Sequence, residues 1–430
     1  MGGYHGMPLS WPHPKYVETV PTISIRSLWW EGSGKMTSQE IHEARYQRRK
    51  AKRLEKNRIR AEKYTEWDSV FGLLPLMGGY KNVSKASKDK TSTQIWMSNL
   101  TVNARKEQKK LANGTWKSPG FNSFSIKERG KWRDIQSAHI SEKGIQNTFA
   151  NNCLIPIIKP HLIHDNGASL KGKGTDFSLK RFVEHLEYHI QKHGLNGGIF
   201  FFDFSSYFAN ILHEPLLTEA GKLIMQKRMC EMYEQISCAF GKIGLGLGSQ
   251  VSQISALFYP NSVDHLIKDQ LGVNGYGRHM DDGYIICDSI EKLKEIAGIF
   301  KEKCKELGIK MNPKKCRIIK ITKQFIFLKT RFFITEPGKI VRRIGRETAR
   351  KERHRLRCFK NFVKMGVMTY QEAFLNFHSW IMSLKRGKAF HLRLNAIRYF
   401  NELFEDYGKY FPPKLNKREY RVVAYIASIA

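Results

Sequence analysis

Three aspartates at the ends of short apolar segments are the residues of this sequence best suited to chemistry. Asp203 closes the run GIFFFD, and Asp281 and Asp282 lie in the centre of YGRHMDDGYII. Taken singly, a carboxylate that caps the next helix and an Asp pair in an ordinary turn are structural alternatives. Taken together, carboxylates at neighbouring strand ends repel one another unless divalent cations neutralise them, and oxygen-only ligands favour Mg²⁺ or Mn²⁺. Two such ions can activate a hydroxyl and hold a triphosphate, so the pattern predicts phosphoryl transfer.

Charge is the second signal in the sequence. Lys and Arg number 73 against 39 Asp and Glu, a formal net charge of +34. So large a charge destabilises a compact chain unless a polyanion is its partner, which predicts nucleic acid and leaves an anionic membrane surface as the alternative. No run approaches the roughly 18 apolar residues of a spanning helix, and no secretory signal is visible. We therefore expect a cytoplasmic protein without a membrane partner.

Hydrophobic periodicity predicts an α+β fold. We expect a basic helix at 39–64, capped by the Thr37–Glu40 segment, and a later order of strand, helices, hairpin, helix and strand that fits an antiparallel sheet covered by helices on one face. The expected strands lie at 124–126, 132–135, 198–204, 276–286, 315–321 and 324–334, and the expected helices at 141–164, 175–193, 206–226, 250–270, 290–307 and after 346.

Several segments follow one another in the order of the reverse transcriptase motifs, and the resemblance covers about residues 120–400. The matching segments are DFSSYF (203–208) for motif A, GSQVSQ (248–253) for motif B, HMDD (279–282) for motif C, LGIKMNPKKC (307–316) for motif D and FIFLKTRFF (325–333) for the primer grip. Motif B has the G-x-x-x-S-Q form of diversity-generating and abortive-infection reverse transcriptases of bacteria. In the primer grip, Lys329 stands where a Gly is usual.

The resemblance implies a right-hand polymerase, with fingers, a palm whose antiparallel sheet carries the hairpin with two aspartates, and a helical thumb. The predicted regions are an irregular N-terminal extension at 1–35, a basic helical region at 36–120, fingers at 121–197, a palm at 198–345 with 215–250 belonging partly to the fingers, and the thumb at 346–430.

The resemblance also implies the site residues. The metal site comprises Asp203, Phe204, Asp281 and Asp282, which would hold two Mg²⁺ or Mn²⁺ ions. The residues expected to bind the incoming deoxynucleotide are Lys127, Lys131, Arg133, Phe208, Gln253 and Lys315, and those expected to bind nucleic acid are Arg48, Arg49, Lys52, Arg53, Lys171, Lys173, Lys329, Lys385 and Arg386.

Several of these assignments leave alternatives open. For Lys127, Lys131 and Arg133 the alternative is a charged surface hairpin, and for Lys171 and Lys173 it is a flexible loop. Phe208 falls where the family keeps an aromatic steric gate that selects deoxynucleotides, but a core aromatic is the alternative, with Tyr207 the next candidate gate. Gln253 and Ser252 are expected to begin a helix under the nascent base pair, or to cap one. Lys315 resembles the lysine that protonates leaving pyrophosphate, a role that Lys314 can also fill. The basic helix at 39–64 either grips nucleic acid or is a solvated charged helix.

The sequence thus predicts a reverse transcriptase that adds deoxynucleotides to a primer on an RNA template, with a cognate non-coding RNA and the cDNA product as partners. The resemblance implies bacterial anti-phage defence or a phage-borne retroelement as its setting. A rival of the same fold is an untemplated or protein-primed DNA polymerase of the abortive-infection type. A rival of another class is a non-catalytic RNA-binding scaffold, against which the intact aspartates argue.

Overall fold

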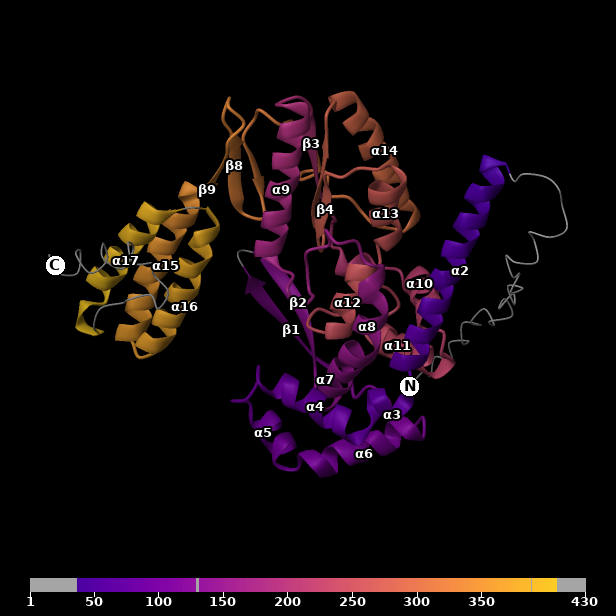
Figure 1. Cartoon of the computed structure of the whole chain (residues 1–430). Helices are drawn as coiled ribbons and strands as arrows, with labels where there is room; N and C mark the ends of the chain where they lie inside the picture. The colour runs from indigo at the N-terminus through magenta and orange to yellow at the C-terminus, as the bar shows by residue number, and fades with distance from the viewer. Residues whose placement is uncertain (1–36, 129–130, 388, 408–430) are drawn as a thin grey trace. The chain divides into compact units, whose positions relative to one another are not determined.

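The computed structural model describes residues 37–128, 131–387 and 389–407 of the chain (Figure 1). The predicted extension at 1–35 and residues 408–430 of the predicted thumb lie outside the described residues. The chain divides into two compact units. The first comprises Met1–Ile163, Ser205–His265 and Lys303–Lys310, and the second comprises His164–Phe204, Leu266–Glu302 and Met311–Ala430.

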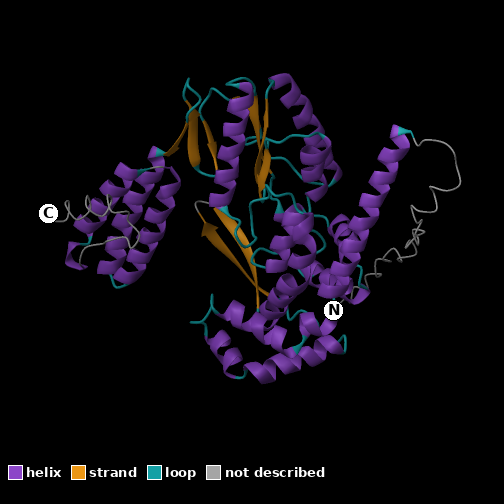
Figure 2. Ribbon diagram, viewed as in Figure 1, coloured by secondary structure: helices purple, strands orange, loops and turns teal. Residues whose placement is uncertain are grey.

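The first unit is mostly helical, with one β-hairpin (Figure 2). Its elements are α2 (Ser38–Tyr64), α3 (Trp67–Phe71), α4 (Leu73–Ser84), α5 (Thr91–Ser98), α6 (Leu100–Ala112), β1 (Phe121–Glu128), β2 (Lys131–Ala138), α7 (Ile140–Phe149), α8 (Ile155–Ile158), α10 (His213–Ile224), α11 (Lys227–Cys238), α12 (Gln250–Phe258) and α13 (Asn261–His265), with a π-helical turn at Ala150–Leu154 and 3₁₀ turns at Lys159–His161 and Phe208–Asn210.

Helix α2 confirms the basic helix expected at 39–64. A capping box starts it, in which the Thr37 hydroxyl accepts from the Glu40 amide and the Glu40 carboxylate accepts from the Thr37 amide at 2.7 Å. Within α2, all of which lies in the described part of the chain, only Ala61 is fully buried. The helix therefore packs through its C-terminal part, against α8 and α10, and exposes the rest.

The packing of α4 on α7 depends on two glycines. A Cβ on Gly79 would lie 2.0 Å from the Thr148 hydroxyl, and one on Gly144 would lie 2.0 Å from the Tyr80 ring. The small residues let the two helices approach closely, and the Tyr80 hydroxyl reaches the carbonyl oxygen of Ser141 at 3.0 Å. This contact fixes α7, the helix that follows the hairpin, against α4.

Three elements of the first unit differ from expectation. Strands β1 and β2 run in register from Phe121 opposite Ala138 to Glu128 opposite Lys131, several residues longer than predicted, because Ser, Asn and Gln at their ends hide the apolar alternation. Helix α11 was not predicted. Its apolar residues recur at helical spacing, and Met229, Tyr233 and Ile236 are buried.

The second unit is built on a four-stranded antiparallel sheet with the order β4-β5-β3-β6. The strands are β3 (Gly198–Asp203), β4 (Tyr276–His279), β5 (Asp282–Cys287) and β6 (Arg317–Lys320), and the helices beside them are α9 (Thr175–His193) and α14 (Ile290–Glu306). All six residues of the inner strand β3 are buried.

The prediction that helices cover one face of this sheet is wrong, because both faces are covered. Successive side chains of a strand point to opposite faces. Phe201 packs on Phe182 of α9, whereas Phe200 and Phe202 pack on Phe300 of α14. The ring centres of Phe202 and Phe300 lie 4.4 Å apart. Helices α9 and α14 therefore lie on opposite sides of the strands (Figure 1). A strand without polar alternation, such as GIFFFD, is typical of burial on both faces.

A second sheet, with the order β7-β8-β9, packs on the α9 side of the first. Its strands are β7 (Phe325–Phe327), β8 (Thr330–Ile334) and β9 (Ile340–Ile344), of which β9 was not predicted. Leu328 and Lys329 form the turn between β7 and β8 with φ angles of 43° and 65°, so the hairpin forms with Lys329 in the left-handed conformation that favours glycine.

The C-terminal helices form a bundle with its own core. They are α15 (Arg346–Lys364), α16 (Tyr370–Ser383) and α17 (Phe390–Leu403), with 3₁₀ turns at Leu384–Gly387 and Glu405–Tyr407. The rings of Phe377 and Phe400 stack 4.3 Å apart in the middle of this core. The expected helical character after 346 is confirmed as far as 407. Among the residues described, none of the helices is long and apolar enough to cross a membrane.

Candidate active site

The ends of three strands bring the three aspartates together. Asp203, the last residue of β3, lies opposite Asp282, the first residue of β5, and Asp282 also lies opposite His279 of β4. Met280 and Asp281 form the two-residue turn between β4 and β5. Asp203 is 3% exposed, and Asp281 and Asp282 are half-buried. The sheet register thus gathers three carboxylates at one edge of an otherwise apolar sheet.

The turn that carries Asp281 has an unusual backbone. Met280 has a φ of 60°, a left-handed conformation that costs an L residue roughly 1–2 kcal/mol. An Arg278 guanidinium N–H donates to the Met280 carbonyl oxygen at 2.9 Å, and a hydrogen bond from a charged donor contributes about 1.5–3 kcal/mol. That single bond is therefore enough to offset the strain. The amide of Phe204 donates to the Asp281 carbonyl oxygen at 3.1 Å.

Burial and mutual repulsion shift the carboxyl groups of the turn. Burial raises the pKa of Asp281, and the charge of Asp203 raises it further. Burial likewise raises the pKa of Asp282, to about 7, with added effects from the charge of Asp281 and a hydrogen bond with Asp203. The site thus disfavours three simultaneous negative charges, which is the condition that a bound cation relieves.

Two side chains of the 307–316 segment engage Asp203. The Asn312 amide donates to one carboxylate oxygen of Asp203 at 2.9 Å, and the Lys315 ammonium forms an ion pair with the other. Partial burial lowers the pKa of Lys315, but the hydrogen bond and charge of Asp203, with the charges of Asp282 and Asp281, outweigh it and raise the pKa. Lys315 therefore stays charged beside the carboxylates. Both Lys314 and Lys315 are exposed, and Lys315 is the one paired with Asp203.

The donor set fits a hard cation that brings ligands of its own. Among the described residues, no three His, Cys, Asp or Glu side chains are arranged to hold a metal ion by themselves. Mg²⁺, however, is usually bound through one or two carboxylates together with substrate phosphates and water. Asp281, Asp282 and the buried Asp203 supply such carboxylates. Phe204 can contribute only its carbonyl oxygen, because its side chain has no ligand atom; its ring packs against Phe202 and Phe300.

The reverse transcriptase (RNA-dependent DNA polymerase) family model matches residues 83–332, more than half of the chain, and this range includes β3, β4 and β5. The chain belongs to the reverse transcriptase family. No curated protein matches the sequence.

Two telomerase structures resemble this reverse transcriptase at low identity. Telomerase from Candida albicans, in complex with a TWJ fragment of telomeric RNA, is 11% identical over 73% of this chain and 58% of its own, with a TM-score of 0.45. Apo telomerase from Candida tropicalis, truncated from its C-terminal domain, is 13% identical over 51% of this chain and 54% of its own, with a TM-score of 0.39. The chain therefore spans less than two thirds of either telomerase chain.

Two neighbouring aromatic residues of the reverse transcriptase differ in environment. Tyr207 is buried, and its hydroxyl donates to the carbonyl oxygen of Ala256 at 2.5 Å, which makes it a core residue. Phe208 begins a 3₁₀ turn and is half-buried. Of the two candidate gates, Phe208 is thus the one whose ring is partly accessible.

Helix α12 begins at Gln250, as expected for the helix at 250–270, so Ser252 and Gln253 lie within its first turn. Ser249 is its N-cap and accepts from the amide of Ser252 at 3.2 Å, and Ser252 itself is buried. Gln253 is exposed within a helix that is otherwise largely buried, so it is available to a ligand.

The predicted triphosphate cations lie on the β1–β2 hairpin. Arg133 is exposed on β2, opposite Ile126 of β1. Lys127 and Lys131 lie within the paired strands, but their side chains are outside the described residues.

The cations predicted to bind nucleic acid in the second unit differ in exposure and in the contacts that they make within the chain. Lys171 is exposed, whereas Lys173 donates to the carbonyl oxygen of His164 at 2.5 Å and lies over the Phe177 ring. Lys329 is held in the β7–β8 turn. Lys385 is exposed, and Arg386 forms an ion pair with Asp176 of α9 at 2.6 Å.

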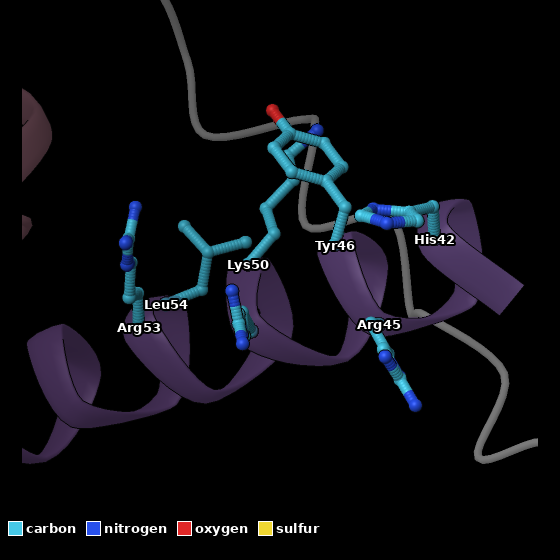
Figure 3. Close-up of a pocket in the computed structure, with 7 residues that line it drawn as sticks. His42, Arg45, Tyr46, Lys50, Arg53 and Leu54 are labelled. Atoms are coloured by element: carbon cyan, nitrogen blue, oxygen red, sulfur yellow. The ribbon is translucent and has the colours of Figure 1, made fainter. Parts of the chain in front are cut away.

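The exposed part of α2 carries the four cations predicted there, Arg48, Arg49, Lys52 and Arg53. A hollow of about 460 Å³ lies along the helix, and the described residues lining it are His42, Arg45, Tyr46, Arg49, Lys50, Arg53 and Leu54, which project from successive turns (Figure 3). Tyr46 is 58% exposed among these cations. A ring surrounded by cations suits a base and its phosphates.

Three residues at the site were not singled out in the sequence. Asn312 lies inside the 307–316 segment, and its hydrogen bond to Asp203 could have been sought there. Arg278 is a charged residue in a buried strand, and a buried charge indicates a hydrogen-bonding or ionic partner. Asp165 lies in an irregular loop, and nothing in its local sequence indicates its network with Arg181 and Lys268.

The raised pKa of Asp282 predicts that Mg²⁺ binding releases protons near neutral pH. A carboxyl group with a pKa of about 7 is mostly protonated at about pH 6, whereas a metal ion binds the deprotonated carboxylate. Mg²⁺ binding at about pH 6 should therefore release close to one proton, and binding at about pH 8.5 should release almost none. Calorimetric Mg²⁺ titration in buffers of different ionisation enthalpy measures this number. Asp282→Asn should lower proton release; equal release at both pH values in the unmodified chain would contradict the assignment.

The half-buried position of Phe208 predicts a role in sugar choice. Phe208→Ala should open space beside the sugar and raise the ratio of kcat/KM for ribonucleotides over deoxynucleotides by at least about tenfold. Tyr207→Phe is the matched control, because it removes only the hydroxyl that bonds Ala256 and should leave the ratio unchanged. An unchanged ratio in Phe208→Ala would mean that the gate lies elsewhere.

Proposed function

We propose that this chain is an RNA-directed DNA polymerase that adds deoxynucleotides to a primer 3′ end through two divalent cations held by Asp203, Asp281 and Asp282. The observation that carries the proposal is the strand register that puts Asp203 opposite Asp282, within the segment that matches the reverse transcriptase family. Mg²⁺ is the cation that the oxygen donors favour, with Mn²⁺ as a substitute.

Different residues of the chain have different proposed roles at this site. Asp203, Asp281 and Asp282 hold the two ions, with the Phe204 carbonyl as a further ligand. Two bound ions would activate the primer hydroxyl and stabilise the leaving oxygen. Lys315, charged and adjacent to Asp203, is the residue suited to give a proton to the departing pyrophosphate.

Substrate selection is proposed for residues of the first unit. Arg133, with Lys127 and Lys131 on the same hairpin, contacts the triphosphate, because cations with several donors bind polyphosphate well. Gln253 touches the nascent base pair, and Phe208 excludes the ribose 2′-hydroxyl. In this proposal residues 121–197 are the fingers, 198–345 the palm with part of the fingers at 215–250, and 346–430 the thumb, preceded by the basic region at 36–120.

The partners in this proposal are an RNA template, such as a cognate non-coding RNA, and the cDNA copied from it. The net charge of +34 supports a nucleic-acid partner. Arg48, Arg49, Lys52 and Arg53 of α2, with Lys171, Lys173, Lys329, Lys385 and Arg386, are proposed to contact the backbone. The G-x-x-x-S-Q form of motif B supports a cytoplasmic role in bacterial anti-phage defence or in a phage-borne retroelement.

Removal of metal-binding charge tests the central claim. Purified protein with Mg²⁺ should extend a DNA primer on an RNA template, and Asp281→Asn or Asp282→Asn should lower kcat by at least about a hundredfold. Asp288→Asn is the matched control, because Asp288 lies just beyond β5 and pairs with Lys292 and His193 at the surface. Primer extension with sequencing of the product is the measurement.

Three outcomes of that experiment separate the proposal from its rivals. A product complementary to the template, lost in the Asn variants, supports templated synthesis. A product of random or single-nucleotide sequence would point to untemplated polymerisation instead. Normal extension by the Asp281→Asn, Asp282→Asn double variant would show that the site is assigned wrongly, and RNA binding without any synthesis would favour the scaffold.

Neutralising the exposed face of α2 tests whether it grips a phosphate backbone. Changing Arg48, Arg49, Lys52 and Arg53 to Gln should weaken affinity for every sequence. It should also flatten the slope of log affinity against log salt by up to about four units, roughly one for each lost phosphate contact. Fluorescence anisotropy across a salt series provides the measurement. The control removes the same charge from α14 by changing Lys292, Lys294, Lys301 and Lys305 to Gln; equal effects of both sets would mean that α2 contributes only net charge.

A further inference from the structure

Strand β4, which leads into the metal-binding turn, has a main-chain partner outside the four-stranded sheet. β4 is an edge strand in the order β4-β5-β3-β6. Asn166 forms a parallel bridge with Arg278, the amide of Arg278 donates to the Asp165 carbonyl oxygen at 3.1 Å, and the amide of Gly167 donates to the Arg278 carbonyl oxygen at 2.8 Å. The loop 165–167 thus covers the open edge of the sheet beside the turn.

The Arg278 side chain extends this support to the turn itself. Arg278 is 1% exposed, and its guanidinium donates to the carbonyl oxygen of Met280, the residue with left-handed backbone. The next carbonyl, that of Asp281, accepts from the Phe204 amide, and Asp282 is paired with Asp203 through the sheet register. Three consecutive residues of the turn therefore each have an anchor, and the anchor of Met280 is the Arg278 side chain.

The loop that braces β4 is itself anchored by a buried carboxylate. Asp165 is 5% exposed and contacts the Arg181 guanidinium at 2.6 Å, the Lys268 ammonium at 2.6 Å and His185 at 3.5 Å. Lys268 also donates to the carbonyl oxygen of Asn274, just before β4. Burial by itself raises the pKa of Asp165, but hydrogen bonds from His185, Arg181 and Lys268 outweigh burial and hold the pKa well below its usual range. The anchor therefore stays charged.

A second side-chain contact ties β4 to α9. The Nδ1 atom of His279 lies 2.8 Å from the Ser178 hydroxyl and 3.2 Å from the Gly167 carbonyl oxygen. Both Arg278 and His279 are thus fixed to elements that carry no metal ligand. A shift of the 164–167 loop would move Arg278 and, through its hydrogen bond, the Met280 backbone. The side chains of Asp281 and Asp282 would then point in a different direction.

We propose that Arg278 and Asp165 are positioning residues that set the backbone of Met280, so that Asp281 and Asp282 can share a cation with Asp203. The inference rests on the proposed function, because it concerns the same site. Arg278 acts through the Met280 carbonyl and touches no substrate, and Asp165 acts through the loop that pairs with β4. Groups that orient metal ligands in this way typically change metal affinity or activity by about 10- to 100-fold when they are lost.

Direct measurement of metal affinity tests the proposal. Arg278→Met keeps much of the side-chain bulk and removes every donor. It should raise the Kd for Mn²⁺, measured by electron paramagnetic resonance, by at least about tenfold. It should raise the Mg²⁺ concentration for half-maximal primer extension by the same factor, with the KM for deoxynucleotide changed by less than about twofold. Arg317→Met is the matched control, because Arg317 is an exposed arginine on β6 of the same sheet and should leave the metal affinity unchanged.

Two further variants keep the test decisive if Arg278→Met does not fold. Arg278→Lys keeps a charged donor and should bind Mn²⁺ more weakly than the unmodified chain and more tightly than Arg278→Met wherever that variant can be measured. Asp165→Asn should weaken Mn²⁺ binding in the same direction, and its effect should be less than additive with that of Arg278→Lys, because both act through one loop. Folded Arg278 variants with unchanged Mn²⁺ affinity would overturn the proposal.

The metal measurement is independent of polymerisation, so the two proposals fail separately. If the unmodified chain makes no product but the Arg278 variants still bind Mn²⁺ more weakly, the positioning role stands and the polymerase assignment falls. If the chain copies RNA and folded Arg278 variants bind Mn²⁺ as well as it does, the polymerase assignment stands and the positioning role falls.

Discussion

The register of β3 against β5 is the constraint on which the rest of the site depends. It places the carboxylates of Asp203 and Asp282 directly opposite each other, and like charges at opposing positions of an antiparallel pair destabilise a sheet. A slip of one residue would relieve the repulsion, but it would also move every side chain of β3 to the other face. The packing of Phe201 on one face and of Phe200 and Phe202 on the other resists that slip. The apolar core therefore holds the charged pair in place.

The same constraint explains why hydrogen-bond donors surround Asp203. Lys315 and Asn312 donate to its two carboxylate oxygens, and both come from the segment that follows α14. A cation held by Asp203 would therefore bind next to the Lys315 ammonium. The residue proposed to protonate pyrophosphate is thereby tied to the carboxylate proposed to hold the metal. A lysine one position earlier, Lys314, lacks this tie and is exposed.

Much of this arrangement could be predicted from local sequence, because apolar runs ending in aspartate mark strand ends. The basic helix α2, helix α9 and the hairpin at 276–286 agree with expectation closely. The coverage of both sheet faces was missed although the unbroken apolar run of β3 indicates it. Strand β9 was missed because Arg342 and Arg343 interrupt its alternation. The partners of Asp165 lie between 16 and 103 residues away along the chain, and such pairing follows from the tertiary fold alone.

Three features that local sequence preference disfavours lie at the turn that bears Asp281. Met280 adopts a backbone angle that favours glycine, Arg278 is a fully buried cation, and two aspartates face each other across a ladder. Each feature is unfavourable alone, and such features persist only where the surroundings over-determine them. Arg278 links two of them, because its buried guanidinium donates a hydrogen bond to the carbonyl oxygen of the strained residue two positions later. A chain selected for stability alone would have little reason to combine a buried arginine with a left-handed methionine, whereas a chain that must aim two carboxylates at one point needs a rigid turn.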